Sequence, residues 1–369
     1  MFNFAIVIFQ TDMKTLKLLI LMSVVMNSLS ACADKGQAGL LEPRGFVTFI
    51  ESNPEVVLVD VRTLEEFTAG HIAGAVNVDW EDDEFLEDFQ GIVPASRPVA
   101  LYCRSGRRSA EAASVLQGKG YTVSDLDGGV LAWQKYGLPL TDGKRDFYET
   151  PSGKTVAVEP LIHASLRITF GELEIEVDPV GEMGDRVTDY SRFPKADIIL
   201  VTHEHHDHLD PGAIKTLEKS DTVVIANRRS ADILGFGKVM ANGDRLTVDG
   251  VEIEAVPAYN TTPERLQFHP QGRDNGYVLN LDGLRIYIAG DTEVTPEMSM
   301  MKDIDVAFLP CNLPYTMTPA QLIEAAEAIR PKVVYPYHYG TTDLSSITPA
   351  LAPEGIYVRI CPFDPGATH

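Results

Sequence analysis

A run of four histidines and two acids at the end of an apolar segment constrains this chain more than any other feature. Residues 198–201 are apolar and largely β-branched, and they lead through Thr202 into His203-Glu204-His205-His206-Asp207-His208. Because buried ionisable groups need partners, so many imidazoles at one strand end are hard to satisfy without a metal ion. The alternative is a solvated loop in which the six residues meet by coincidence. We therefore predict a metal centre at this strand end.

Length and charge place this centre in an acidic protein of two domains. The chain has 369 residues, with 31 Lys and Arg against 53 Asp and Glu, and a net charge of −22. That length suits two domains that each bury a core. The excess negative charge repels phosphate backbones, so nucleic acid is not an expected partner.

The N-terminal segment predicts export and a lipid anchor. Lys14 and Lys17 precede a short apolar run, which is followed by Leu29-Ser30-Ala31-Cys32, the arrangement of a secretory signal rather than a membrane span. Leu-Ser-Ala-Cys resembles the bacterial lipobox, so residues 13–32 are expected to form a lipoprotein signal whose Cys32 is lipidated. The protein would then be an exported bacterial lipoprotein, anchored to the membrane on the periplasmic or cell-surface side. The alternative is a simple signal peptide with Cys32 as a free thiol.

A first globular unit is expected over residues 40–140. Residues 56–60 and 99–103 are short β-branched runs of the kind that form buried parallel strands. A helical segment follows the second run, so Cys103 is expected on a strand-to-helix loop. Loop N–H groups, the helix N-terminus and three arginines would favour a nucleophilic thiolate there: Arg104, Arg107 and Arg108. The alternative is a buried, inert cysteine.

This unit resembles the single-domain rhodaneses. The similar segments are Val59–Arg62, Glu65–Phe67, Gly70–Asn77, Leu126–Gly129 with Trp133, and the loop Cys103–Arg108. The resemblance implies that Cys103 accepts a sulfur atom from a sulfane-sulfur donor as a persulfide and passes it to a thiol acceptor. Arg104 or Arg108 would stabilise the persulfide, whereas Asp60 and Arg62 would support the loop.

The remainder of the chain predicts a linker and a second globular unit. Residues 141–153 are polar, rich in turn-forming residues and without periodicity, so we expect a linker. Residues 154–369 contain many short apolar runs and few helical segments, chiefly 211–219 and 319–329. The expected fold class is α/β: an N-terminal rhodanese-like parallel sheet with helices, then an αβ/βα sandwich of two sheets covered on their faces.

The pattern His-x-His-x-Asp-His in this second unit resembles the signature of the metallo-β-lactamase superfamily. Ala289–Thr292 and Tyr335–Gly340 follow strands, as the bridging carboxylate and the late histidine of that family do. Asp178-Pro179 and Leu161–Ser165 resemble the opening strands of its lactonase-like branch of metal-dependent hydrolases.

The resemblance implies two adjacent metal sites in this chain. The first metal would be bound by His203 and His205, the second by Asp207, His208 and His338, and both by Asp291, with Asp207 also counted as catalytic. The place of the first site's third histidine is held by Asn260, a poor ligand for zinc but a tolerable one for Mn²⁺. His269 could replace it from the loop, or the first metal could be labile. One or two divalent ions are expected, zinc or manganese, with iron as a further candidate.

The expected function is hydrolysis of a small-molecule substrate by a metal-dependent, exported enzyme that carries a rhodanese-type sulfurtransferase module. Persulfide dioxygenases, which combine the same two folds and use one iron, are the main alternative. They resemble the glyoxalase branch, and a single iron needs no second ligand set at Asp207 and His338. A non-catalytic sensing lipoprotein is a third interpretation, against which the intact ligands argue. Cys311 and Cys361 are expected to be packing residues rather than a disulfide.

Overall fold

The computed structural model describes residues 39–363, which begin with a five-stranded sheet of order β1-β5-β4-β2-β3. All of its strands pair in parallel. They are β1 (Leu40–Leu41), β2 (Val57–Asp60), β3 (Val76–Asn77), β4 (Val99–Tyr102) and β5 (Val123–Leu126). The helices of this part are α2 (Pro43–Ser52), α3 (Leu64–Ala69), α4 (Phe85–Ile92), α5 (Arg107–Gly118) and α6 (Gly129–Lys135).

Both faces of this sheet are covered, which accounts for the continuous apolar character of its central strands. On one face Val59 and Leu101 pack with Phe89 of α4 and Leu116 of α5. On the other face Ala100 belongs to a second buried cluster, together with residues of α2 and α6. The parallel sheet with flanking helices that we expected here is confirmed.

Two larger sheets follow, of order β15-β14-β13-β10-β9-β8-β7-β6 and β16-β17-β18-β19-β20-β21-β22. The first is built of β6 (Leu140–Thr141), β7 (Asp146–Glu149), β8 (Thr155–Pro160), β9 (Leu166–Phe170), β10 (Leu173–Val177), β13 (Ile198–Val201), β14 (Val223–Ala226) and β15 (Lys238–Val239). The second is built of β16 (Arg245–Val248), β17 (Val251–Ala258), β18 (Asp274–Leu281), β19 (Leu284–Ile288), β20 (Val306–Pro310), β21 (Val333–Tyr337) and β22 (Tyr357–Val358). A small hairpin, β11 (Glu182–Met183) and β12 (Arg186–Val187), lies outside them.

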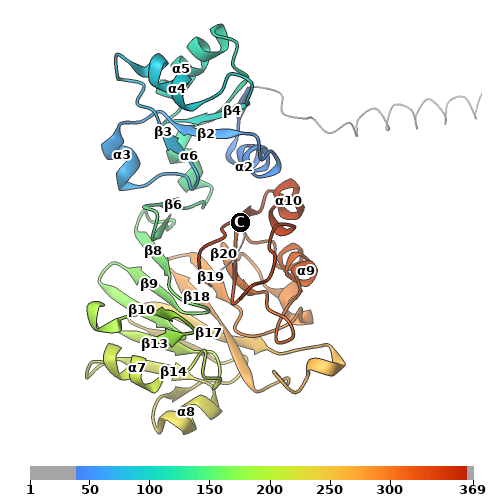
Figure 1. The fold of residues 1–369 in the computed structure, drawn as a ribbon. Helices are drawn as coiled ribbons and strands as arrows, with labels where there is room; N and C mark the ends of the chain where they lie inside the picture. The colour runs from blue at the N-terminus through green and yellow to red at the C-terminus, as the bar shows by residue number, and fades with distance from the viewer. Residues whose placement is uncertain (1–38, 364–369) are drawn as a thin grey trace, which may run out of the picture. The chain divides into compact units, whose positions relative to one another are not determined.

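The two sheets pack face to face, with helices on the outer sides of the sandwich. Strand β13 shows how: Ile198 and Leu200 belong to the central core, while Ile199 and Val201 pack with the apolar residues of α7 (Pro211–Leu217). Figure 1 shows α7 and α8 (Arg228–Leu234) beside the first sheet, and α9 (Pro319–Ile329) and α10 (Ile347–Leu351) beside the second. The expected αβ/βα sandwich is therefore confirmed.

The segment that we expected to be a linker contributes instead to the first sheet. Strand β7 pairs antiparallel with β6 and with β8. The polar residues of β7 suggested a linker, but in the structure they find partners within the fold. Asp146 accepts two hydrogen bonds of 2.8 Å from Arg359, and the Tyr148 hydroxyl lies 2.7 Å from the Tyr335 hydroxyl. A strand stabilised by such side-chain pairs lacks the apolar alternation that sequence analysis looks for.

Three further expectations concern the N-terminal signal and the cysteines. The signal segment 13–32, with Cys32, lies outside the described residues. No helix in residues 39–363 is long and apolar enough to cross a membrane. Within the same range Cys103, Cys311 and Cys361 are buried free thiols, so Cys311 and Cys361 pack without forming a disulfide.

Candidate metal centre and thiol site

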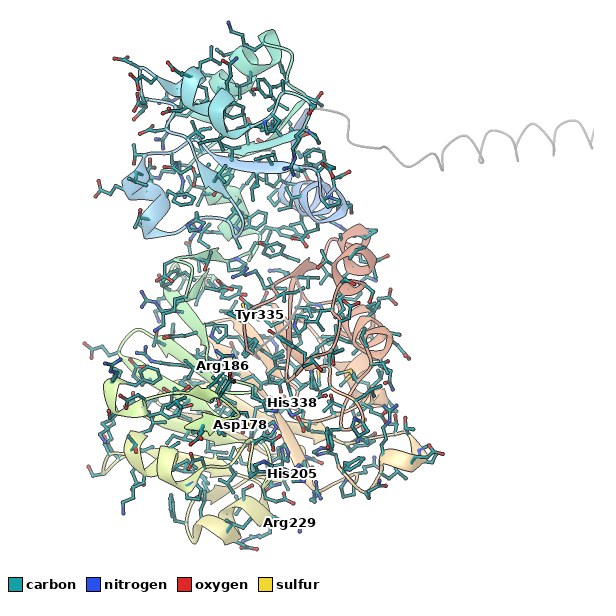
Figure 2. All side chains as sticks on the ribbon, viewed as in Figure 1. Asp178, Arg186, His205, Arg229, Tyr335 and His338 are labelled. Atoms are coloured by element: carbon teal, nitrogen blue, oxygen red, sulfur yellow. The ribbon has the colours of Figure 1, made fainter. Side chains whose placement is uncertain are left out.

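The metal centre lies where strands of both large sheets end. The loop 203–208 follows β13, Asp291 follows β19, and His338 follows β21. His163 lies in the turn between β8 and β9, and His269 lies in the loop before β18. Figure 2 labels His205 and His338 in this region, together with Asp178.

Two groups of ligand atoms lie side by side there. Within each group the atoms lie within 4.8 Å of one another; the groups are His203, His205, His269 and Asp291, and His163, Asp207, His208 and His338. Asp291 connects the two groups, because its Oδ2 lies 3.3 Å from His269 Nε2 and 3.3 Å from His338 Nε2. Its Oδ1 lies 3.3 Å from His208 Nε2. The structure thus brings together every metal ligand that the sequence indicated, apart from Asn260.

The two candidates for the third ligand of the first group have different surroundings. The ring of His269 belongs to the group, whereas the Asn260 side chain donates hydrogen bonds from Nδ2 to the carbonyls of Arg265 and Tyr315, at 3.2 and 2.8 Å. The Asn260 backbone N–H donates to the His269 carbonyl at 2.8 Å. Asn260 therefore braces the loop, and His269 supplies the ring nitrogen.

We expect His269→Ala to weaken the first metal site by more than tenfold, because the first metal loses one of four strong ligands. Asn260→Ala is the matched control, and it should leave both affinities within a few-fold of the unmodified protein. Titration with a mild chelator, followed by elemental analysis of the retained metal, measures both variants. Equal metal loss from the two variants would contradict the assignment of His269.

His163 is the site residue that sequence analysis missed. Its segment was assigned only to an opening strand, and a lone histidine in a turn gives no metal signal of its own. In the structure its Nε2 lies 3.3 Å from Asp207 Oδ2, and its ring centroid lies 3.8 Å from that of His338. The backbone joins the two as well, since the His338 N–H donates to the His163 carbonyl at 3.1 Å.

The backbone is strained at three positions of this centre. His163, Asp178 and His338 have φ values of 56°, 43° and 49°, in the left-handed region that side-chain-bearing residues rarely adopt. Gly290, at φ 65°, shows why the residue before Asp291 has no side chain: a Cβ there would lie 2.8 Å from the Asn275 carbonyl. Strain concentrated in this way is typical of a functional site.

Two further carboxylates orient the histidines from behind. Asp178 accepts from His208 Nδ1 at 2.8 Å and from the Thr202 hydroxyl at 2.7 Å. Asp274 lies 3.0 Å from His269 Nδ1 and is itself held by Arg273. A carboxylate on Nδ1 fixes the ring so that Nε2 faces the centre, which is how metal-binding histidines are usually held.

Electrostatics favour cations in this centre. Burial raises the pKa of Asp291, but the neighbouring His338 and His208 outweigh it and hold that pKa well below its usual range. Burial lowers the pKa of His338, yet Asp291 and Asp207 outweigh it and raise that pKa to about 9. For His203 burial prevails, and the pKa lies well below its usual value. Ligands in this state bind protons or metal ions in competition, so metal binding releases protons.

The donor set fits divalent metal ions. Several ring nitrogens and one carboxylate oxygen in the described part of the chain are buried without a hydrogen-bond partner: His208 Nε2, His269 Nε2, His338 Nδ1 and Nε2, and Asp291 Oδ1. Each such atom costs about 1–3 kcal/mol when it is left unsatisfied. A metal ion at each group would satisfy them with the imidazole and carboxylate ligands that zinc, manganese and iron accept.

The second candidate site is the loop between β4 and α5. Cys103 is 1% exposed, and its Sγ accepts hydrogen bonds from the Gly106 N–H at 3.2 Å and from the Ser109 hydroxyl at 3.4 Å. Gly129, at φ 59°, lies against the loop, where a Cβ would approach the Cys103 carbonyl to 2.3 Å. The loop therefore closes around one sulfur and presents polar hydrogens to it.

The side chains around this loop agree only in part with the expected roles, in which Asp60 and Arg62 support the loop and Arg104 or Arg108 stabilises a persulfide. Arg62 forms a buried ion pair with Asp60 and donates to the Gly70 carbonyl, a supporting position. Arg104 is exposed, and Arg108 makes two hydrogen bonds of 2.8 Å to Glu66. Sequence analysis assigned no role to Glu66 or Ser109: Glu66 was only part of a rhodanese-like segment, and Ser109 only the end of the loop.

Comparisons with known proteins cover both parts of the chain. A model of the rhodanese-like domain matches residues 48–136, and a model of the beta-lactamase superfamily domain matches residues 158–338. A metal-dependent hydrolase of the UPF0173 family from Thermococcus kodakarensis is 34% identical over 198 residues, which are 50% of this chain and 85% of that protein. Its counterpart from Pyrococcus abyssi is 35% identical over 195 residues, with the same shares covered.

A solved structure agrees with these relatives. A candidate metal-dependent hydrolase from Parabacteroides distasonis is 56% identical, with a TM-score of 0.57, and covers 59% of this chain and 97% of its own. The signature 203–208, the ligands at the strand ends and the fold agree with these similarities. The chain belongs to the UPF0173 family of metal-dependent hydrolases of the metallo-β-lactamase superfamily, and it carries a rhodanese-like domain before the hydrolase domain.

Proposed function

We propose that the chain is an exported, lipid-anchored enzyme with two reactions: hydrolysis of a small-molecule substrate at the metal centre, and sulfur transfer at Cys103. The observation that carries the first reaction is the pair of ligand groups joined by Asp291. Bound metal ions would supply Lewis-acid polarisation of a carbonyl or phosphoryl oxygen and activation of a water molecule.

Other residues of the chain would orient the metal ligands and leave one carboxylate accessible to a substrate. Asp178 and Asp274 fix the rings of His208 and His269, so that the ligand atoms keep their geometry while a substrate binds. Asp207 is 19% exposed at its side chain, against 3% for Asp291. Asp207 is therefore the more accessible of these two carboxylates, and its Oδ1 lies 4.0 Å from Nδ1 of the exposed His206.

Metal content tests this proposal most directly. The full chain would be expressed in defined medium with zinc, manganese or iron, and analysed for bound metal together with hydrolysis of a panel of lactones, esters and phosphodiesters. Two equivalents of zinc or manganese with hydrolysis support the proposal. One equivalent of iron with oxidation of glutathione persulfide would support the persulfide dioxygenase alternative instead. The two ligand groups favour hydrolysis, because a single iron leaves the second group without a role.

Sulfur transfer is proposed from the environment of Cys103. The Gly106 N–H and the Ser109 hydroxyl both point at Sγ, which is where a thiolate or persulfide anion needs hydrogen bonds. The thiolate would attack a sulfane sulfur, hold it as a persulfide and release it to a thiol acceptor. Arg104, which is exposed, and Arg108 are the two arginines of the loop that we propose to stabilise the persulfide.

Export and lipidation rest on the sequence pattern alone. We expect Cys32→Ala to move the protein from the membrane fraction to a soluble periplasmic or secreted fraction, because the acyl chains provide the membrane affinity. Cell fractionation and the intact mass of the mature chain measure the effect. Unchanged fractionation together with an unchanged mass would rule out lipidation at Cys32.

A further inference from the structure

The loop that follows Cys103 contributes less net positive charge than its three arginines suggest. Arg108 forms a two-pronged ion pair with Glu66, and Arg107 lies 3.3 Å from Glu111. Within residues 39–363, Arg104 is the one arginine of the loop that forms no ion pair with a carboxylate. Two of the three positive charges are thus matched by glutamates.

Glu66 is a fixed feature of this site rather than a mobile surface acid. Its Oε2 accepts from the Thr63 N–H at 3.2 Å, and the Thr63 hydroxyl accepts from the Glu66 N–H at 3.3 Å, a capping box at the start of α3. The side chains of Arg108 and Glu66 are 12% and 29% exposed. The hydrogen bonds from Arg108 are the largest of the effects that lower the pKa of Glu66 to about 2, so the carboxylate is ionised at physiological pH.

Glu66 is linked to the thiol loop through Arg108. Arg108 lies in the first turn of α5, directly before Ser109, whose hydroxyl donates to Cys103 Sγ at 3.4 Å. The positive charge of Arg108 also acts on both Glu66 and Cys103. Arg108 cannot turn fully toward an anionic donor without giving up two short charge-assisted hydrogen bonds. A dianionic donor at Cys103 would therefore find the charge of Arg108 already paired with Glu66.

We infer that Glu66 sets the donor preference of this site, which favours organic persulfides on an uncharged carrier over dianionic thiosulfate. This inference rests on the proposed sulfur transfer at Cys103. In the favoured reaction the Cys103 thiolate attacks the terminal sulfur of R–S–SH. The new bond joins Cys103 Sγ to that sulfur, the original S–S bond breaks, and R–S⁻ leaves with the electron pair of the broken bond. No oxidant or reductant is consumed.

The test compares two donors on the full chain. Thiosulfate and the persulfide of 2-mercaptoethanol are each mixed with the protein, and intact-protein mass spectrometry follows the gain of one sulfur atom. Glu66→Gln keeps the capping box, because glutamine also serves at that position, and removes one negative charge. We expect this variant to load from thiosulfate about tenfold faster, with less than a twofold change for the persulfide. The gain should shrink at high salt.

Glu111→Gln is the matched control, since it releases the exposed Arg107 instead, and both donor rates should stay within twofold. A thermal melt of each variant verifies folding. Equal donor rates in the unmodified protein, or an unchanged thiosulfate rate in a folded Glu66→Gln variant, would overturn the inference while leaving sulfur transfer in place. Failure of the unmodified protein to load from either donor would instead overturn the proposed sulfur transfer itself.

Discussion

Asp291→Ala should lose both metal ions and reduce hydrolysis by about a thousandfold or more. The carboxylate contributes to both ligand groups, with Oδ1 near His208 and Oδ2 near His269 and His338. Its removal also takes away the negative charge nearest to several buried imidazoles, which weakens the attraction of the centre for any cation, metal ions included. Elemental analysis of the purified variant, before and after dialysis against metal, measures the first effect without knowledge of the substrate.

Asp232→Ala is the control for this experiment. Asp232 is an exposed aspartate of α8 that pairs only loosely with Arg228, at 3.7 Å, so metal content should not change. If the folded Asp291→Ala variant retained two equivalents of metal, Asp291 would not connect the two sites. Retention of one equivalent would show that Asp291 serves a single site.

Sequence analysis located most of the metal centre because its signals are dense and local. Four histidines and two acids directly after a β-branched strand indicate a metal site by themselves. The segment Ala289–Thr292 also follows a strand, and its resemblance to the family's bridging carboxylate identified Asp291. The fold class followed from many short strands with few helices. Each of these inferences depends on residues that lie close together in the sequence.

The remainder depended on contacts between distant residues. His163 reaches Asp207 from a turn more than forty positions earlier in the chain, and no local pattern marks it. The choice between Asn260 and His269 depended on how the loop folds, and the structure shows Asn260 bound to loop carbonyls. Likewise, the sequence suggests that Arg108 is a free cation, whereas in the structure Glu66 of another helix lies opposite it.

Cys103→Ser should abolish sulfur transfer while leaving the metal content intact. A serine hydroxyl is a far weaker nucleophile at neutral pH and cannot form a persulfide, so we expect a loss of about a thousandfold or more with either thiosulfate or an organic persulfide. The metal ligands lie at strand ends of the two larger sheets, whereas Cys103 follows β4 of the five-stranded sheet, so the substitution leaves every ligand in place. Thiocyanate formation from thiosulfate and cyanide, with elemental analysis of the same sample, measures both outcomes.

Cys311→Ala separates this effect from the general loss of a thiol. Burial raises the pKa of Cys311 to about 12, so that thiol stays protonated and is a poor nucleophile. Its side chain is fully buried, so the alanine variant should lose some stability but retain sulfur transfer within twofold. Sulfur transfer retained in Cys103→Ser would show that another thiol carries the sulfur, and loss in the folded Cys311→Ala variant would point to Cys311. Loss only in Cys103→Ser would leave the thiol beside Gly106 and Ser109 as the sulfur carrier, because it is the one described cysteine whose Sγ accepts these two hydrogen bonds.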